Sequence, residues 1–287
     1  MIRKLKIILE MIKFEHTVFA LPFAYFGAML GAFIVNGTMP TFSQWIWITV
    51  AMVGARSAAM SLNRVIDEQI DKHNPRTATR AIPAGLVSKI EVLLFIIISF
   101  ALLFYAAFKL NMLAVYLLPA AVFFLVIYSY TKRFTWMCHI ILGVTIGIAP
   151  LGGWVGATGT LTWEALLLFL AVALWTAGFD VIYATQDADY DREHGLFSIP
   201  SRFGIGRALK IARFLHVISF LSFLGLFFFT ELGWLYFIGV IIAGVIMIYE
   251  HSLVSEDDLS KLNVAFFTMN GILSIVMFIF AMGDVLL

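Results

Sequence analysis

The sequence has little charge and a single cysteine, and both shortages narrow what the chain can be. Only 13% of its residues are charged and the formal net charge is +1, which argues against nucleic acid or any strongly charged partner. Cys138 cannot form an internal disulfide, so we expect it to pack as a small apolar residue in a helix. The six histidines are scattered without the spacing typical of metal ligands.

Apolar sequence is abundant: 62% of the residues are hydrophobic, with a mean hydropathy of +0.96. About nine runs are long enough to cross roughly 30 Å of hydrocarbon as helices. Backbone polar groups must be satisfied inside lipid, so these runs predict an all-α, polytopic membrane protein. We expect residues 1–287 to form a single transmembrane domain. The predicted spans are residues 16–36, 42–63, 91–109, 111–130, 138–157, 162–182, 211–230, 233–250 and 264–284.

The distribution of basic residues predicts an orientation. Of the 19 lysines and arginines, Lys109 alone falls on the outer side when the N-terminus is placed inside. The positive-inside rule therefore predicts an integral protein of the cell (inner) membrane, with its N-terminus cytoplasmic and its C-terminus external. The first apolar run is too long for a signal peptide and lacks a clear cleavage site, so we expect it to be retained.

Polar residues concentrate in two long inner connections, and the first of them carries an acidic ladder. Asn63, Asp67 and Asp71 are spaced four residues apart, which places them along one helix face with neighbours about 5–6 Å apart. Like charges at this spacing repel, so the ladder requires a compensating cation. Mg²⁺ prefers oxygen ligands and typically combines one or two carboxylates with substrate phosphates.

The second inner connection repeats the pattern roughly 120 residues later, as expected for a pseudo-repeat. Asp180, Asp187 and Asp191 share one helix face by their spacing, and Asp189 points elsewhere. The two ladders can clamp two Mg²⁺ ions on one diphosphate, a leaving group whose charge must be neutralised. Basic residues that suit the same ligand follow each motif or lie between them: Arg76, Arg80, Lys132, Arg133, Arg192 and Arg202.

Arg56 lies inside the second predicted span, seven residues before Asn63 and on the same face. An ionisable residue within a membrane is a functional candidate by default. A structural ion pair explains Arg56 equally well from the sequence, so both interpretations stay open.

Four motifs together resemble the UbiA superfamily of intramembrane aromatic prenyltransferases. Asn63-x3-Asp67-x3-Asp71 resembles the first aspartate motif of that family, and RTATRAIPAG, which begins at Arg76, resembles its continuation. YSYTKRFT, from Tyr128, is similar to the middle-loop motif, and FDVIYATQDADYD to the second aspartate motif. The similarity covers most of the chain.

The resemblance implies a helical bundle around a central cavity that opens to the cytoplasmic side. It implies that Mg²⁺ joins a polyprenyl diphosphate to both motifs and that the resulting allylic cation alkylates a small aromatic acceptor. Metal ligands would be Asn63, Asp67, Asp71, Asp187 and Asp191, and the four aspartates would be catalytic. Substrate-binding residues would be Asn63, Arg76, Arg80, Lys132, Arg133, Asp180, Tyr183 and Arg202. The expected pathway is quinone biosynthesis, with 4-hydroxybenzoate or a similar acid as the acceptor.

One departure from the family pattern concerns phosphate binding. Many members carry a lysine where this chain has Phe197, and Arg202 is our candidate for the missing contact. The stretch EHGLFSIPSRFG resembles a 4-hydroxybenzoate polyprenyltransferase subgroup, some of whose members serve the futalosine route to menaquinone. A prenyltransferase of that route with a different acceptor is therefore an alternative.

Two functions of other classes fit these motifs less well than prenyl transfer does. An ion-coupled transporter would place its charges near the bilayer midplane, whereas these carboxylates cluster at predicted cytoplasmic helix ends beside arginines. A CDP-alcohol phosphotransferase would carry an Asp-Gly and Ala-Arg signature, which the sequence lacks. Prenyl transfer is the favoured interpretation.

Overall fold

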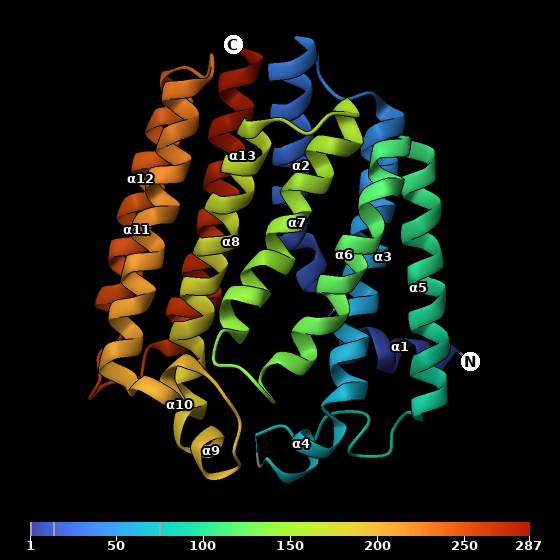
Figure 1. Ribbon diagram of the computed structural model, residues 1–287, viewed down its shortest axis with the longest axis vertical. Coiled ribbons are helices and arrows are strands. Elements are labelled where there is room, and N and C mark those ends of the chain that lie inside the picture. The colour runs from blue at the N-terminus through green and yellow to red at the C-terminus, as the bar shows by residue number, and fades with distance from the viewer. Residues whose placement is uncertain (1, 14, 75) are drawn as a thin grey trace.

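The computed structural model describes every residue except 1, 14 and 75, and the side chains of these residues except 2 and 15–20. All regular secondary structure in the described residues is helical, and the long helices stand side by side as a bundle (Figure 1). This confirms the predicted all-α fold class. The long helices are α2 (Glu15–Asn36), α3 (Phe42–Ile66), α5 (Lys89–Leu110), α6 (Met112–Thr131), α7 (Cys138–Thr158), α8 (Trp163–Ala184), α11 (Ile205–Phe229), α12 (Trp234–Ser252) and α13 (Asn270–Leu286).

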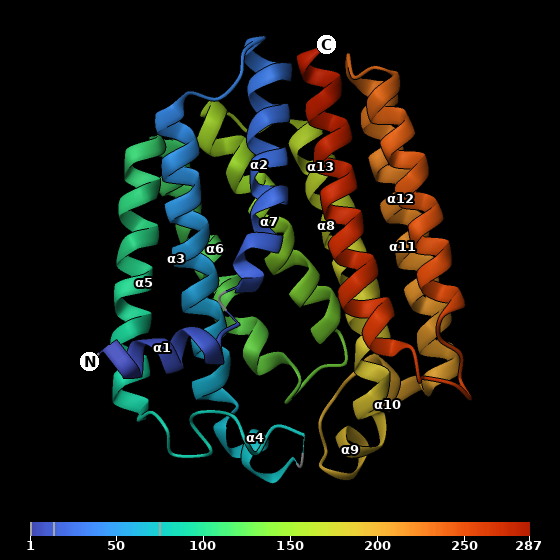
Figure 2. The same ribbon diagram turned by 180° about the vertical axis from the view of Figure 1, so that it is seen from behind.

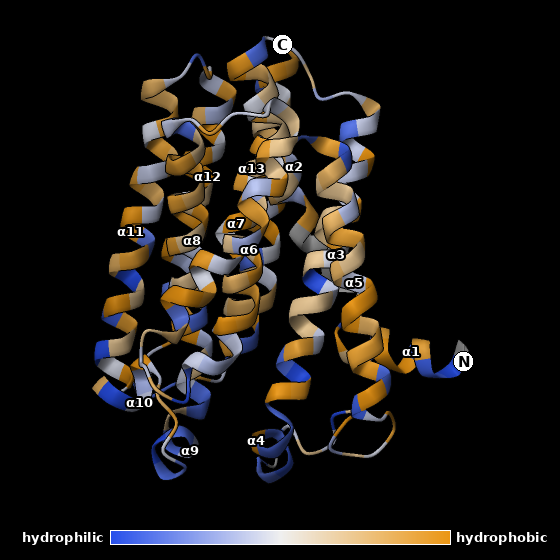
Figure 3. Ribbon diagram, turned by 45° about the vertical axis from the view of Figure 1, so that its right-hand side comes forward, coloured by the Kyte–Doolittle hydropathy of each residue, from blue (hydrophilic) through white to orange (hydrophobic). Residues whose placement is uncertain are grey.

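Eight spans within the described residues are long and apolar enough to cross a membrane. The remaining predicted span, 16–36, corresponds to α2, whose described apolar portion is Leu21–Asn36. Figure 3 shows the long helices mostly hydrophobic, with hydrophilic residues gathered on the short helices at one end. The chain is therefore an integral membrane protein with multiple spans.

The polar end of the bundle is built from short helices between the long ones. It contains α4 (Glu68–His73), a 3₁₀ turn η1 (Thr185–Asp187), α9 (Ala188–Glu193) and α10 (Ile199–Phe203). Seen from behind, α1 (Ile2–Met11) lies across α3 and α5 towards the same end, and the C-terminus lies at the opposite end (Figure 2). A π-helical turn, η2 (Val264–Met269), precedes α13.

Helix starts follow the local sequence. Thr41 and Gln44 form a capping box at the start of α3, and Ser88 and Glu91 form one at the start of α5. These boxes satisfy backbone N–H groups that a helix start leaves without partners. The helices therefore begin where the apolar runs meet polar residues.

Small residues let α7 pack closely on both of its main neighbours, α2 and α8. A Cβ atom at Gly153 would lie 2.0 Å from the carbonyl oxygen of Ala24 in α2. A Cβ atom at Gly143 would lie 2.2 Å from the carbonyl oxygen of Ala173 in α8. Only glycine permits such backbone approach, which is typical of helix packing in membranes. The helices α2, α7 and α8 thus form a tightly packed part of the bundle.

Candidate active site

The first aspartate motif lies where α3 gives way to α4. The sequence predicted one continuous helix face, but α3 ends at Ile66 and Asp67 stands between the two helices with φ −89° and ψ 3°. Asp67 and Asp71 are almost fully buried, with exposed fractions of 1% and 3%. Buried carboxylates require compensating partners, and the surrounding loops supply them.

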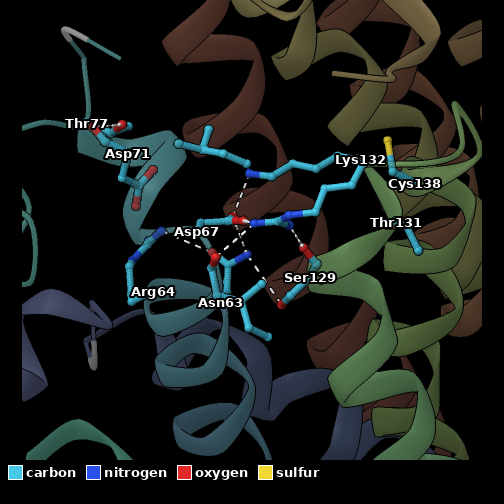
Figure 4. Close-up of polar contacts among 12 residues, drawn as sticks. Asn63, Arg64, Asp67, Asp71, Thr77, Ser129, Thr131, Lys132 and Cys138 are labelled. Atoms are coloured by element: carbon cyan, nitrogen blue, oxygen red, sulfur yellow. Dashed lines mark hydrogen bonds and ion pairs between the residues drawn. The ribbon is translucent and has the colours of Figure 1, made fainter. Parts of the chain in front are cut away.

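Asp67 is held by the middle loop that follows α6. Lys132 Nζ lies 2.6 Å from Asp67 Oδ2, and Arg133 Nη2 lies 2.9 Å from Asp67 Oδ1. Asn63 Nδ2 donates to Asp67 Oδ2 at 3.0 Å (Figure 4). Arg133 also donates to the carbonyl oxygens of Ser129 and Ile66, which fixes the loop against α3. Two separate sequence motifs are therefore one cluster in space.

Asp71 has its own cation. Arg80 Nη1 donates to both carboxylate oxygens of Asp71 at 2.7 Å, and the hydroxyl of Thr77 donates to its carbonyl oxygen at 3.1 Å. The Arg-Thr-containing loop thus folds back over the aspartate that precedes it. Because Asp71 faces this loop, it lies apart from the cations that hold Asp67.

The second aspartate motif is also interrupted. Its predicted single face is divided, because α8 ends at Ala184 and the 3₁₀ turn precedes α9. Asp187 accepts two hydrogen bonds from Arg76, to Oδ1 at 3.2 Å and to Oδ2 at 2.7 Å. Asp189 points outward as its spacing predicts, with its side chain 86% exposed. Arg76 therefore joins the two halves of the chain.

A cavity of about 190 Å³ lies between these groups. Five of the predicted site residues line it: Asn63, Lys132, Asp180, Asp187 and Asp191. The remaining lining residues are Tyr128, Ser129, Cys138, His139, Leu142, Ala184, Phe197 and Ser198. The cavity thus brings α3, α6, α7 and α8 together at the polar end of the bundle.

Two predicted substrate-binding residues lie against aromatic side chains. Tyr183 stacks on Phe266 with ring centroids 4.0 Å apart. The guanidinium carbon of Arg202 lies 5.7 Å from the centre of the Trp136 ring and 5.6 Å from that of Phe203. Neither Tyr183 nor Arg202 is among the residues that line the cavity. Phe197, by contrast, reaches the cavity itself.

His139 is a site residue that sequence reasoning missed. Its Nδ1 lies 2.6 Å from Oδ2 of Asp180, and both residues line the cavity. Histidine spacing gave no signal, because the partner is an aspartate 41 positions away. Cys138, expected to pack in a helix, is the first residue of α7, and its thiol lies 3.4 Å from the carbonyl oxygen of Phe197.

The donor atoms at this site suit Mg²⁺, which favours carboxylate and amide oxygens. Among the described residues, no three His, Cys, Asp or Glu side chains gather closely enough to hold a metal ion. Lys132, Arg80 and Arg76 instead stand beside the carboxylates of Asp67, Asp71 and Asp187. Metal binding would therefore require these ion pairs to open, and the released cations would then be free to meet a phosphate.

Comparison with known proteins agrees with this geometry. The UbiA prenyltransferase family model matches residues 21–272. A 4-hydroxybenzoate octaprenyltransferase from Vibrio campbellii is 30% identical over 234 residues, covering 81% of each chain. The enzyme of the same description from Tolumonas auensis is 29% identical over 222 residues, covering 77% of each chain.

Solved structures share the fold. A UbiA homologue from Aeropyrum pernix superimposes with a TM-score of 0.85 at 32% identity, over 94% of this chain and 98% of that one. A UbiA homologue from Archaeoglobus fulgidus, bound to GPP and Mg²⁺, has a TM-score of 0.73 at 18% identity, over 98% of this chain and 100% of that one.

Proposed function

The chain belongs to the UbiA prenyltransferase family, whose enzymes transfer a prenyl group from a prenyl diphosphate, and we propose that its acceptor is an aromatic acid of the 4-hydroxybenzoate type. The reaction would release pyrophosphate and serve quinone biosynthesis. The observation that carries this proposal is a cavity lined by Asn63 and Lys132 from one side and by Asp187 and Asp191 from the other. The ion pairs Lys132–Asp67 and Arg76–Asp187 tie the two aspartate motifs together beside it.

The chain's own residues have distinct parts in this reaction. Carboxylates of Asp67, Asp71, Asp187 and Asp191, with the amide of Asn63, would hold Mg²⁺. The metal supplies charge neutralisation that turns the diphosphate into a good leaving group. Arg76, Arg80, Lys132 and Arg133 would bind the phosphate oxygens once their carboxylate partners take up metal. We keep Asp180, Tyr183 and Arg202 as proposed substrate-binding residues.

Arg56 supports an acidic acceptor. It lies within the membrane span of α3, and its Nε is buried without a hydrogen-bond partner in the described structure. Its electrostatic neighbour is Tyr128, which lines the cavity. A guanidinium nitrogen that is buried without a hydrogen-bond acceptor is costly, and the carboxylate of an aromatic acid would supply that acceptor. A different aromatic acid, as in the futalosine route, would satisfy the same residue.

We also propose the orientation that the basic residues predict. Figure 1 shows the short helices α4, α9 and α10, together with α1, towards one end of the bundle and the C-terminus at the other. The cavity residues Asp187 and Asp191 belong to the end with the short helices. We assign the cavity end and the N-terminus to the cytoplasm, which would give water-soluble acceptors and Mg²⁺ access to the site. Clustering of the carboxylates at this end supports an enzyme rather than an ion-coupled carrier, whose charges would lie near the midplane.

A direct assay tests the proposal. Membranes containing the protein are incubated with Mg²⁺, a polyprenyl diphosphate and a panel of aromatic acceptors, and products are identified by mass spectrometry. The panel pairs 4-hydroxybenzoate with phenol, which lacks the carboxylate. We expect the wild-type protein to form prenylated 4-hydroxybenzoate and little prenylated phenol. In Arg56→Leu, the ratio of prenylated 4-hydroxybenzoate to prenylated phenol should be smaller than in the wild type. Equal use of both compounds by the wild-type protein would overturn the acidic acceptor, and absence of any prenylated product would overturn prenyl transfer to aromatic compounds.

A further inference from the structure

Helix α1 differs in direction from the long helices of the bundle. Figure 2 shows it lying across α3 and α5 rather than along them. The long helices cross the membrane, so a helix laid across them runs along the membrane plane. This position is typical of helices that lie at the boundary between lipid and water. None of the residues assigned to the site lies in α1, so the proposed function does not explain the composition of this helix.

One side of α1 packs against the protein. Ile8 and Ile12, four residues apart, are 5% and 1% exposed. Lys4 contacts Glu91 in the first turn of α5, which fixes α1 to that helix. Ile8 shares a buried apolar cluster with two residues of α5 and three of the loop that follows Arg80: Val92, Ile96, Ala81, Ile82 and Val87. Helix α1 therefore covers the loop that connects Arg80 to α5.

The rest of the surface of α1 divides into an apolar side and a basic side. Leu5 and Leu9 are four residues apart and so share one side of the helix, where Leu5 is 46% exposed. A further side, which continues into the turn after α1, carries four exposed residues at intervals of three and four: Arg3, Lys6, Glu10 and Lys13. Adjacent apolar and basic sides are typical of helices that place one side among acyl chains and the other at the headgroups.

The basic strip, which we define as Arg3, Lys6 and Lys13, carries positive charge that the protein leaves largely uncompensated. Lys6 Nζ lies 3.8 Å from Glu10 Oε1, and the two side chains are 77% and 63% exposed, so this pair contributes little. Neither Arg3 nor Lys13 has an ion-pair partner among the residues that the structure describes. An anion outside the chain would therefore complement the basic strip.

The surface beside α1 indicates which anion this is. Ile90, Leu94 and Ile97 of α5 are exposed apolar side chains on a membrane-spanning helix, where acyl chains would cover them. Because Lys4 contacts Glu91, α1 lies beside the first turns of α5, where this apolar surface begins. Phospholipid headgroups lie at the edge of such a surface. The continuity with lipid therefore favours headgroup phosphates over a protein partner.

We propose that α1 is an interfacial anchor whose basic strip binds the phosphate groups of anionic phospholipids. Leu5 and Leu9 would lie among acyl chains beside the exposed side chains of α5. Anionic lipids attract basic side chains close to the membrane surface, and the contributions of several such side chains combine. Because the protein-facing side of α1 covers residues 81–87, lipid binding would also hold this loop in place.

Amide hydrogen exchange of the full-length protein tests the anchor without any substrate. The protein is reconstituted in vesicles of phosphatidylcholine alone and in vesicles of equal parts phosphatidylcholine and phosphatidylglycerol. One triple variant removes the basic strip, and a matched control removes the same charge from exposed residues of α11 and the loop before η2: Arg3→Gln/Lys6→Gln/Lys13→Gln and Arg207→Gln/Lys210→Gln/Lys261→Gln.

We expect the amides of α1 in the wild type to exchange about tenfold more slowly in the mixed vesicles than in phosphatidylcholine, because three basic side chains would bind the anionic surface together. Amides of residues 81–87 should slow by a smaller factor. Both differences should disappear in the variant without the basic strip, and also in about 0.5 M salt, which screens surface charge. The control variant should keep them.

Three results would overturn the anchor. Equal exchange of α1 in the two kinds of vesicle would exclude anionic headgroups and leave a protein partner as the reason for the basic strip. A full difference in the variant without the basic strip would show that these three residues do not bind lipid. Loss of the difference in the control would reveal a general effect of net charge. Since no substrate is present, none of these results depends on the proposed function.

Discussion

In the first aspartate motif the carboxylates are buried among cations, whereas in the second they lie nearer to solvent with fewer partners. Asp67 alone contacts two cationic side chains, and Asp71 contacts a third. Asp187 has one such partner, Arg76, which comes from the first half of the chain. The two halves are therefore complementary: the first half and the middle loop contribute the positive charge, and the second contributes carboxylates that depend on it.

Removing carboxylates should have the largest effect and should separate the motifs. Asp67→Ala, Asp71→Ala, Asp187→Ala and Asp191→Ala should each lower turnover by about 10²-fold or more, as expected when a charge-stabilising group is lost. Asp67→Ala should in addition lower stability by about 1–3 kcal/mol, because Lys132 and Arg133 lose their shared partner. Turnover and thermal unfolding in detergent measure the two effects.

The exposed Asp189 provides the control for these variants, and Asp189→Ala should change neither quantity. Near-normal turnover in all four variants, with correct membrane insertion, would refute the metal clamp. Equal loss of stability in Asp67→Ala and Asp191→Ala would refute the contrast between the two motifs.

Replacing the cationic side chains should have the next largest effect on catalysis, and it should weaken the use of prenyl diphosphate but not that of the acceptor. Arg80→Ala and Lys132→Ala should raise the KM for prenyl diphosphate about tenfold while the KM for the acceptor stays unchanged, because charge-assisted bonds to phosphate would be lost. Steady-state kinetics with each substrate varied separately measures this. Arg192→Ala is the control, since Arg192 pairs with the exposed Asp189. If these variants raise the KM for the acceptor and leave the KM for prenyl diphosphate unchanged, the cations belong to the acceptor site and not to the diphosphate site.

Changes at Arg76, which joins the two halves of the chain through Asp187, should lower activity by a smaller factor that depends on hydrogen-bond geometry. Arg76 contacts Asp187 through two nitrogen atoms, and lysine cannot reproduce that paired geometry. Arg76→Lys should therefore lower activity about three- to tenfold, and Arg76→Ala should lower it further. Activity at several Mg²⁺ concentrations is the measurement. If Arg76→Lys has the activity of the wild type, the positive charge of residue 76 is sufficient and the paired hydrogen bonds of the guanidinium are not needed.

The smallest effect concerns Phe197, where the chain departs from the family pattern, and Arg202, the proposed substitute for the missing phosphate contact. Phe197 lines the cavity, so Phe197→Lys should tighten prenyl diphosphate binding about two- to threefold. Arg202→Ala should weaken it less than Arg80→Ala does, because the Arg202 guanidinium already lies over the Trp136 ring. A double-mutant cycle in diphosphate affinity measures any coupling. Strict additivity would show that the two positions do not share a phosphate.

Fold class followed from sequence because hydrocarbon thickness dictates the length of apolar runs. The predicted span 42–63 corresponds to α3, which continues to Ile66 and therefore carries Asn63 on its last turn. The periodicity of the sequence did not predict the breaks that follow α3 and α8 within the two aspartate motifs. Neither Asp67 nor Thr185 is a helix breaker such as proline, and tertiary ion pairs with loop cations accompany both breaks.

Partners within the site were also beyond local sequence. Arg76 and Asp187 are 111 positions apart, and Lys132 and Asp67 are 65 apart, so only the folded bundle brings them together. Residue types and the resemblance predicted that these side chains serve one ligand, but not which cation meets which carboxylate. The sequence could not identify His139 as a site residue, because a single histidine has no diagnostic spacing and its contact with Asp180 exists only in the folded chain.

The glycines of α7 have a consequence for hydrogen exchange and for substrate entry. With backbone atoms of α2 and α8 directly against it, α7 can neither rotate nor slide without collision. We therefore expect the fluctuations that admit a prenyl chain to arise outside α7, in the loops of the polar end or in helices such as α5 and α6 that expose apolar side chains. Amides of α7 should be among the last in the bundle to exchange with deuterium, and those of residues 76–88 among the first.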